Sequence, residues 1–157
     1  WYYTGGKSPY GYAALGEVSV FIFFGLVATI GTEYIQTRDF SANTLLGGIA
    51  MGAISSAVLM VNNIRDIEGD TKVGKRTFAV RLGDTRARRF YMLLIFLSIV
   101  TAFSVTILSV LAIFPAMSLL NQIQFKKGKE LIEVLGATGK FQLILGALIS
   151  IGSMVFN

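Results

Sequence analysis

Long apolar segments limit this chain to a narrow set of folds. Residues 17–36, 43–62 and 139–156 are each mostly apolar, and residues 90–124 contain no charged side chain. An α-helix needs about 20 apolar residues, and at least about 17, to cross the hydrocarbon core of a bilayer. Only 15% of the 157 residues are charged, whereas soluble domains average about a quarter. The sequence therefore predicts an all-α integral membrane protein.

Basic residues indicate how the long segment 90–124 divides. Residues 63–89 hold eight Lys or Arg and residues 126–140 hold four. Two spans between these loops would place both loops and Lys7 on one side, leaving only Arg38 of the 14 basic residues opposite. The positive-inside rule favours that arrangement, with the basic loops in the cytoplasm. We therefore expect a bundle of about five spans, at 17–36, 43–62, 90–107, 108–125 and 139–156. Within residues 126–138, Lys and Glu pairs spaced four residues apart beside apolar side chains suggest a short interfacial helix.

Missing residue types exclude several kinds of chemistry. The chain has no cysteine and no histidine, so it has no disulfide, no thiol nucleophile, no histidine acid–base group and none of the usual zinc or haem ligands. The chain opens on Trp1 rather than Met, in a polar, glycine-rich segment. We therefore expect it to be the C-terminal part of a longer protein.

Small side chains form a stripe on the second predicted span, at Gly47, Gly48, Gly52 and Ala53. In membranes such stripes permit close approach of two helices. No matching partner is evident within the chain, so we expect this stripe to pack against helices that precede Trp1.

The longest polar passage begins where the second span ends. Asn62, Asp66 and Asp70 are spaced four residues apart, which stacks their side chains on one face of a helix, with Glu68 on the other side. Charge this close to the bilayer is costly and usually functional. Two carboxylates suit Mg²⁺, which commonly takes one or two of them and completes its shell with water and substrate phosphates.

Cations follow these acids, and they would suit a phosphate group. They are Lys72, Lys75, Arg76 and Arg81. The pattern predicts a metal–diphosphate site, but three alternatives remain. The segment could be a solvated loop, or part of an ion-coupled transporter, whose charges would lie nearer mid-membrane. It could also belong to a structural subunit with a basic loop on anionic lipid, which would not need the spaced aspartates.

The run NNIRDIEGDTKVGKRTFAVRLG at residues 62–83 resembles the second aspartate-rich motif of the UbiA-type intramembrane prenyltransferases. More narrowly, it resembles their 1,4-dihydroxy-2-naphthoate polyprenyltransferase branch, as do residues 3–12 and 31–37. The resemblance implies a nine-helix bundle around a central cavity, of which this chain would form the last five helices. The first aspartate-rich motif and the four helices that carry it have no counterpart here.

The resemblance also implies a reaction and the residues that serve it. The enzyme would transfer a polyprenyl group from polyprenyl diphosphate to 1,4-dihydroxy-2-naphthoate with loss of CO₂, giving demethylmenaquinone and diphosphate. Other aromatic acceptors, such as 4-hydroxybenzoate, remain open, and the prenyl chain length depends on walls that the missing helices supply. The residues implied are Asp66 and Asp70 as Mg²⁺ ligands, Asn62 as a ligand or its support, and Arg65, Lys75 and Arg76 for the diphosphate.

Overall fold

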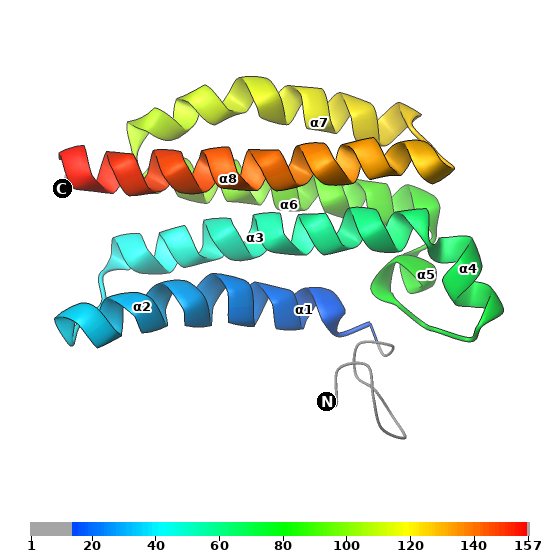
Figure 1. The fold of residues 1–157 in the computed structure, drawn as a ribbon, viewed down its shortest axis with the longest axis horizontal. Coiled ribbons are helices and arrows are strands. Elements are labelled where there is room, and N and C mark those ends of the chain that lie inside the picture. The colour runs from blue at the N-terminus through cyan, green and yellow to red at the C-terminus, as the bar shows by residue number, and fades with distance from the viewer. Residues whose placement is uncertain (1–13, 157) are drawn as a thin grey trace.

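The computed structural model describes residues 14–156, and the predictions made for residues 1–12 lie outside that part of the chain. Five long helices lie side by side and are joined at the two ends of the bundle (Figure 1). Each is long and apolar enough to cross a membrane: Gly16–Thr37, Ala42–Arg65, Asp84–Val105, Ile107–Phe125 and Gly128–Val155. The predicted all-α bundle with five spans is confirmed.

The first span has three consecutive parts, α1 (Gly16–Val20), a π-helical segment η2 (Phe21–Val27) and α2 (Ala28–Thr37). The second span is α3 (Ala42–Arg65), and Ser41 caps it because the Ser41 Oγ accepts a hydrogen bond of 3.1 Å from the Thr44 N–H. Glu33 accepts hydrogen bonds from the N–H and the hydroxyl of Ser41, at 3.1 and 3.3 Å. The turn between the two spans is therefore tied by side chains from both.

α3 is the central helix, with the first span on one side and α6 and α8 on the other (Figure 1). Its small-residue stripe meets the first span, where a Cβ added at Gly25 would lie 2.4 Å from the Gly52 Cα and 2.6 Å from the Gly48 carbonyl oxygen. The expectation of close helix packing is correct, but the expectation that the stripe packs against helices outside the chain is wrong for Gly48 and Gly52. Because Gly25 has no side chain, the backbone of the first span can approach the backbone of α3 this closely.

The remaining elements complete the bundle. Thr106 is extended, with φ −152° and ψ 140°, and it divides residues 90–124 into two spans as predicted. Its side chain packs on the last helix, where a Cβ at Gly152 would lie 2.5 Å from the Thr106 Cβ. In order the elements are α4 (Ile67–Lys72), α5 (Phe78–Leu82), α6 (Asp84–Val105), η3 (Ile107–Ala112), α7 (Ile113–Phe125), η4 (Gly128–Glu130) and α8 (Leu131–Phe156).

The predicted interfacial helix at 126–138 is wrong, because α8 runs without a break from Leu131 to Phe156. Its first turns face the bundle, where Leu131 and Val134 are fully buried and the Thr138 hydroxyl lies 2.9 Å from the Tyr91 hydroxyl. Burial of this apolar face against α6 keeps the segment in line with the span. Lys140 consequently lies more than two turns inside α8 and not in a loop.

The two basic loops lie at the same end of the bundle (Figure 1). Arg88, in the second turn of α6, donates hydrogen bonds to the Ile123 and Lys126 carbonyl oxygens, the latter at 2.9 Å, and to Asp84 Oδ2 at 2.8 Å. One buried guanidinium thus joins the start of α6 to the end of α7. α6 begins at Asp84, so the predicted span 90–107 is preceded by a polar first turn that those contacts support.

Replacing Gly25 with Ala should destabilise the protein, because the added methyl group forces two backbones apart. Overpacking of this kind costs about 1–3 kcal/mol, so the thermal unfolding midpoint in detergent should fall. Gly31→Ala is the matched control, since a Cβ at Gly31 meets nothing within 4 Å and Ala favours a helix over Gly. Equal midpoints for the two variants would contradict a close contact at Gly25.

Candidate functional site

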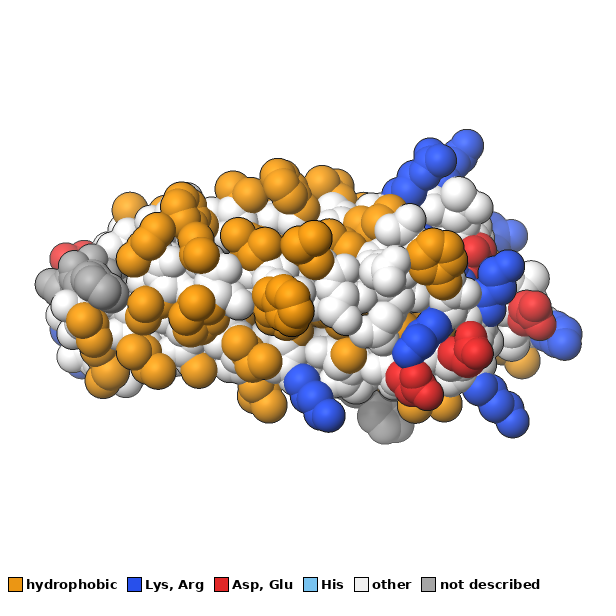
Figure 2. Space-filling view, turned by 90° about the horizontal axis from the view of Figure 1, so that it is seen from above, with side chains coloured by type: hydrophobic (Ala, Val, Ile, Leu, Met, Phe, Trp, Pro, Cys, Tyr) orange, Lys and Arg blue, Asp and Glu red, His pale blue; other side chains and the backbone are white. Residues whose placement is uncertain are grey.

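Charged side chains gather at one end of the molecule in Figure 2, while the visible surface elsewhere is largely hydrophobic or uncharged. This is the end at which α3 passes into α4 and α5 (Figure 1). The predicted site residues all lie on this end, in the last turn of α3 and in the segment that follows it.

Asp66 stands at the break between α3 and α4, with φ −98° and ψ 6°. The Asp66 N–H donates to the Asn62 carbonyl oxygen at 3.2 Å, and the Asp70 N–H donates to the Asp66 carbonyl oxygen at 2.8 Å. The four-residue hydrogen-bond spacing of a helix therefore continues through the break. Glu68 lines a cavity with Arg65, Asp84 and Arg88, and neither Asp66 nor Asp70 lines it.

Arg65 holds the first aspartate. Its Nε and Nη2 donate to the two carboxylate oxygens of Asp66 at 2.7 and 2.6 Å, and Nη2 also donates to Asn62 Oδ1 at 2.9 Å. This is the bidentate pairing that guanidinium and carboxylate groups favour. The structure thus brings together Asn62, Arg65 and Asp66, three residues that the sequence had placed in one site.

Asp70 is buried, with 9% of its surface exposed, and it has its own cation. Lys75 Nζ lies 3.2 Å from Asp70 Oδ1, and the Lys75 N–H donates to the Asp70 carbonyl oxygen at 2.9 Å. Gly74, at φ +74°, makes the turn that brings Lys75 back, since the left-handed region favours glycine. Arg76 is exposed, and its side chain has no hydrogen bond or ion pair with the described residues.

The donor set at Asp66 and Asp70 fits a hard cation. Residues 14–156 contain no group of three or more His, Cys, Asp or Glu side chains placed to hold a metal. Two carboxylates at the end of a membrane helix still match Mg²⁺, because that ion completes its octahedral shell with water and phosphate oxygens. Asp70 is the more buried of the two ligand candidates, and Lys75 lies beside it.

An apolar groove starts beside Asn62 and follows the same helix away from the charged end. It has a volume of about 480 Å³ and lies between the first span, α3 and α8. Its lining residues are Val20, Phe24, Ser55, Val58, Leu59, Asn62, Leu135 and Gln142. A long hydrocarbon chain could lie in this groove with a polar head near Asn62.

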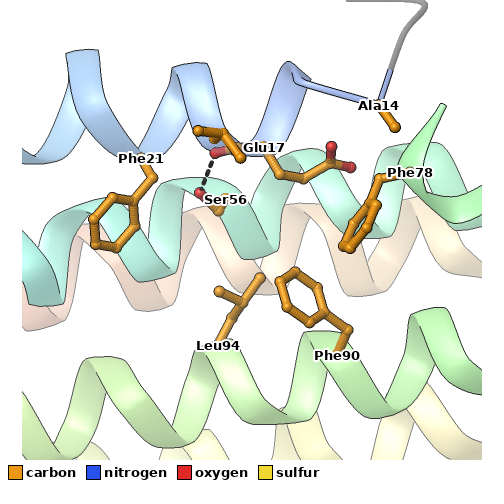
Figure 3. Close-up of a pocket in the computed structure, with 8 residues that line it drawn as sticks. Ala14, Glu17, Phe21, Ser56, Phe78, Phe90 and Leu94 are labelled. Atoms are coloured by element: carbon orange, nitrogen blue, oxygen red, sulfur yellow. Dashed lines mark hydrogen bonds between the residues drawn. The ribbon is translucent and has the colours of Figure 1, made fainter. Parts of the chain in front are cut away.

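A second cavity contains a buried carboxylate that the sequence analysis did not single out. Glu17 is 4% exposed, its Oε1 accepts a hydrogen bond of 2.8 Å from Asn63 Nδ2, and its Oε2 has no partner among the described residues. The Ser56 hydroxyl donates to the Glu17 carbonyl oxygen at 2.9 Å. Figure 3 shows the Glu17 side chain running between α1 and α3 toward Phe78.

Sequence reasoning assigned Glu17 no role, and it entered only as the first residue of the predicted span 17–36. The signal that could have found it is a carboxylate inside the first turn of an apolar span, where burial is expensive without a partner or a function. Its partner, Asn63, follows Asn62 in the chain, so a hydrogen bond joins the aspartate-rich run to Glu17.

The family model described as the UbiA prenyltransferase family matches residues 1–131. The chain is 39% identical over its full length to 1,4-dihydroxy-2-naphthoate octaprenyltransferase of Mycobacterium tuberculosis, of which it covers 56%. It is 43% identical, over 62% of its length, to the protein of the same name from Escherichia coli, of which it covers 32%. UbiA prenyltransferase domain-containing protein 1 of Gallus gallus is 30% identical over 98% of the chain, which covers 47% of that protein.

The chain spans at most about half the length of the curated relatives it matches, and no solved structure matches it. The match of the family model covers most of the chain and includes the whole run from Asn62 to Gly83. With five apolar spans and an aspartate-rich run at the end of the second, the chain belongs to the UbiA prenyltransferase family.

Proposed function

We propose that the protein containing this chain transfers a polyprenyl group from polyprenyl diphosphate to 1,4-dihydroxy-2-naphthoate, with loss of CO₂, to give demethylmenaquinol, the hydroquinone from which demethylmenaquinone forms by oxidation. The observation that carries the proposal is the pair Asp66 and Asp70 at the charged end of α3, each with a cation beside it. The names of the mycobacterial and E. coli relatives support the naphthoate acceptor. Prenyl transfer to another aromatic acceptor, such as 4-hydroxybenzoate, is the alternative that a direct comparison of the two substrates would decide.

At this end of the bundle, the acidic residues would bind the metal and the basic residues would bind the diphosphate. Asp66 and Asp70 would hold Mg²⁺, which neutralises the charge of a diphosphate and assists its departure. Lys75 lies close enough to Asp70 to reach the same phosphate oxygens, and Arg76 follows it at the surface. Arg65, already bonded to Asp66 and Asn62, would orient the carboxylate and offer its remaining N–H groups to the substrate.

The reaction replaces a carbon–oxygen bond with a carbon–carbon bond. The allylic C–O bond of the prenyl diphosphate breaks, and the diphosphate leaves with the electron pair. The electron-rich naphthoate ring attacks the allylic cation through the carbon that carries the carboxylate. CO₂ then leaves from that carbon, and its bonding electrons restore the ring. The apolar groove that begins at Asn62 suits the prenyl chain, because it runs away from the charged end along α3.

The other half of the active site would come from helices outside these 157 residues. A cavity that encloses a diphosphate and an aromatic ring needs walls on every side, and this chain spans about half of its relatives. We propose that preceding helices of the same protein supply a further aspartate-rich motif and the opposite wall.

Orientation in the membrane follows from the basic end of the bundle. The loops around α4 and at 126–130 carry most of the Lys and Arg residues, whereas Arg38 lies at the opposite end. We propose a multi-pass protein of the cell membrane with the basic end in the cytoplasm, as the positive-inside rule requires.

Asp66→Asn and Asp70→Asn should each lower prenyl transfer by at least about 100-fold in the full-length protein, equivalent to about 2.7 kcal/mol in the barrier. The substitution removes charge that would hold Mg²⁺ while it retains the side-chain shape. Product formation at saturating Mg²⁺ measures the effect, and the thermal midpoint reports folding. Glu68→Gln is the matched control on another face, and near-normal turnover in either Asn variant would refute the metal-ligand role.

Lys75→Ala should raise the apparent KM for the prenyl diphosphate, or lower kcat, with little change in the KM for the aromatic acceptor. The reason is that a group bonded to phosphate acts on one substrate only. Lys129→Ala is the control, because Lys129 is exposed in the other basic loop at the same end of the bundle. Steady-state kinetics with each substrate varied in turn gives the comparison, and equal changes for both substrates would indicate a structural role.

Single cysteines can test the orientation, since this chain contains none. Thr85→Cys and Lys129→Cys place exposed thiols at the basic end, and Asp39→Cys places one at the opposite end. An impermeant thiol reagent should label only the Asp39 variant in intact cells and all three after permeabilisation. Labelling of the Thr85 variant in intact cells would reverse the proposed orientation.

A further inference from the structure

Glu17 lines a cavity whose other walls are almost entirely apolar. The cavity has a volume of about 200 Å³ and is formed by the first span, α3, α5 and α6. Its lining residues besides Glu17 are Ala14, Val18, Phe21, Ser56, Phe78, Phe90 and Leu94. Ligand sites commonly combine apolar and aromatic walls with a few placed polar groups, and most exceed about 300 Å³. This cavity would therefore suit a small aromatic molecule.

The Glu17 carboxylate is only half satisfied by the described residues. Asn63 supplies one hydrogen bond, to Oε1, while Oε2 is buried and has no partner there. Leaving a buried polar oxygen without a partner costs more than a typical hydrogen bond contributes. A ligand that forms a hydrogen bond with Oε2 would remove this cost, and ligand binding is one explanation for a buried polar atom without a partner. Oε2 is therefore placed to accept a hydrogen bond from something that enters the cavity.

The aromatic side chains in the cavity wall favour a flat ligand. Phe78 and Phe90 meet edge to face, with ring centroids 5.0 Å apart and planes at 82°. Figure 3 shows both rings on the side of the cavity opposite α1, with Leu94 next to Phe90. Flat rings pack favourably against such aromatic walls. The cavity thus combines a flat-ring surface with one acceptor oxygen, which matches a hydroxylated arene.

Glu17 is also tied to the diphosphate end of the site. Its partner Asn63 precedes Asp66 by three residues, which is less than one turn of helix, or about 5 Å along the axis. A ring bonded to Glu17 would consequently lie close to the carboxylates proposed to hold Mg²⁺. A carbon on that ring could then meet the prenyl carbon released at the same end.

We infer that Glu17 binds the aromatic acceptor, with Oε2 accepting a hydrogen bond from a ring hydroxyl while the ring packs against Phe78 and Phe90. This rests on the proposed prenyl-transfer function and deepens it, since it assigns the acceptor subsite. Accepting that hydrogen bond leaves more electron density on the ring oxygen, and through it on the ring carbon that attacks. The proton stays on the hydroxyl, so no further reactant is needed.

Glu17→Gln in the full-length protein tests the inference. The amide keeps the shape of the side chain and can keep the Asn63 bond through Oε1, but it replaces the acceptor Oε2 with a donor. With Mg²⁺ and an unreactive prenyl thiodiphosphate present, the Kd for 1,4-dihydroxy-2-naphthoate, followed by its fluorescence, should rise about tenfold or more. In turnover the acceptor KM should rise similarly, while the KM for the prenyl diphosphate stays within about twofold. Glu33→Gln, at the far end of the same span, is the control.

A second variant keeps the test decisive if Glu17→Gln fails to fold. Leu94→Phe places a larger side chain in one wall, so it fills part of the cavity without changing the carboxylate. This variant should also weaken naphthoate binding. Unchanged naphthoate binding in either folded variant would overturn the inference, as would a wild-type protein that does not bind the naphthoate. A wild-type protein that binds the naphthoate without transferring a prenyl group would refute the proposed reaction, while the comparison of Kd values would still decide the role of Glu17.

Discussion

The contact between the first span and α3 sets the geometry on which the rest of the bundle depends. A Cβ at Gly25 would lie 2.4 Å from the Gly52 Cα, and a Cβ at Gly52 would lie 2.8 Å from the Phe21 carbonyl oxygen, so neither position has room for one. In lipid, apolar surface alone gives helices little reason to associate, so close packing of small residues and interhelical hydrogen bonds must hold them. The same two helices share the bonds from Ser56 and Asn63 to Glu17, so the close approach also fixes the carboxylate beside the aspartate-rich run.

Charge compensation organises the end of the bundle to which that contact leads. Asp66 is held by Arg65, Asp70 by Lys75, and Arg88 closes the end of α7 through two carbonyl oxygens. Each pair orients a group that would otherwise be solvated. The surplus of basic residues leaves a positive field over a partly apolar surface, and such a field concentrates anionic substrates. The proposed substrate, a diphosphate with a hydrocarbon tail, would fit both properties.

The sequence alone determined the number of spans and the position of the aspartate-rich run. Bilayer thickness sets the length of a helix that can cross it, so uncharged runs such as residues 90–124 could be counted and divided. The helical repeat placed Asn62, Asp66 and Asp70 one turn apart, and the distribution of Lys and Arg placed both basic loops at one end. These inferences hold because each depends on residues near one another in the chain or on a property of the membrane.

Only the tertiary structure decided which faces meet. Glu17 and Asn63 are 46 residues apart, and the apolar pattern around Glu17 was equally consistent with a residue at the membrane surface. The glycine stripe of α3 could have faced any neighbour, and its partner is Gly25. The segment 126–138 had an amphipathic pattern, yet burial of Val134 and Leu131 against the bundle made it the start of α8. Helical periodicity specifies a face, but the partner of that face depends on the mutual rotation and register of the helices, which no local pattern encodes.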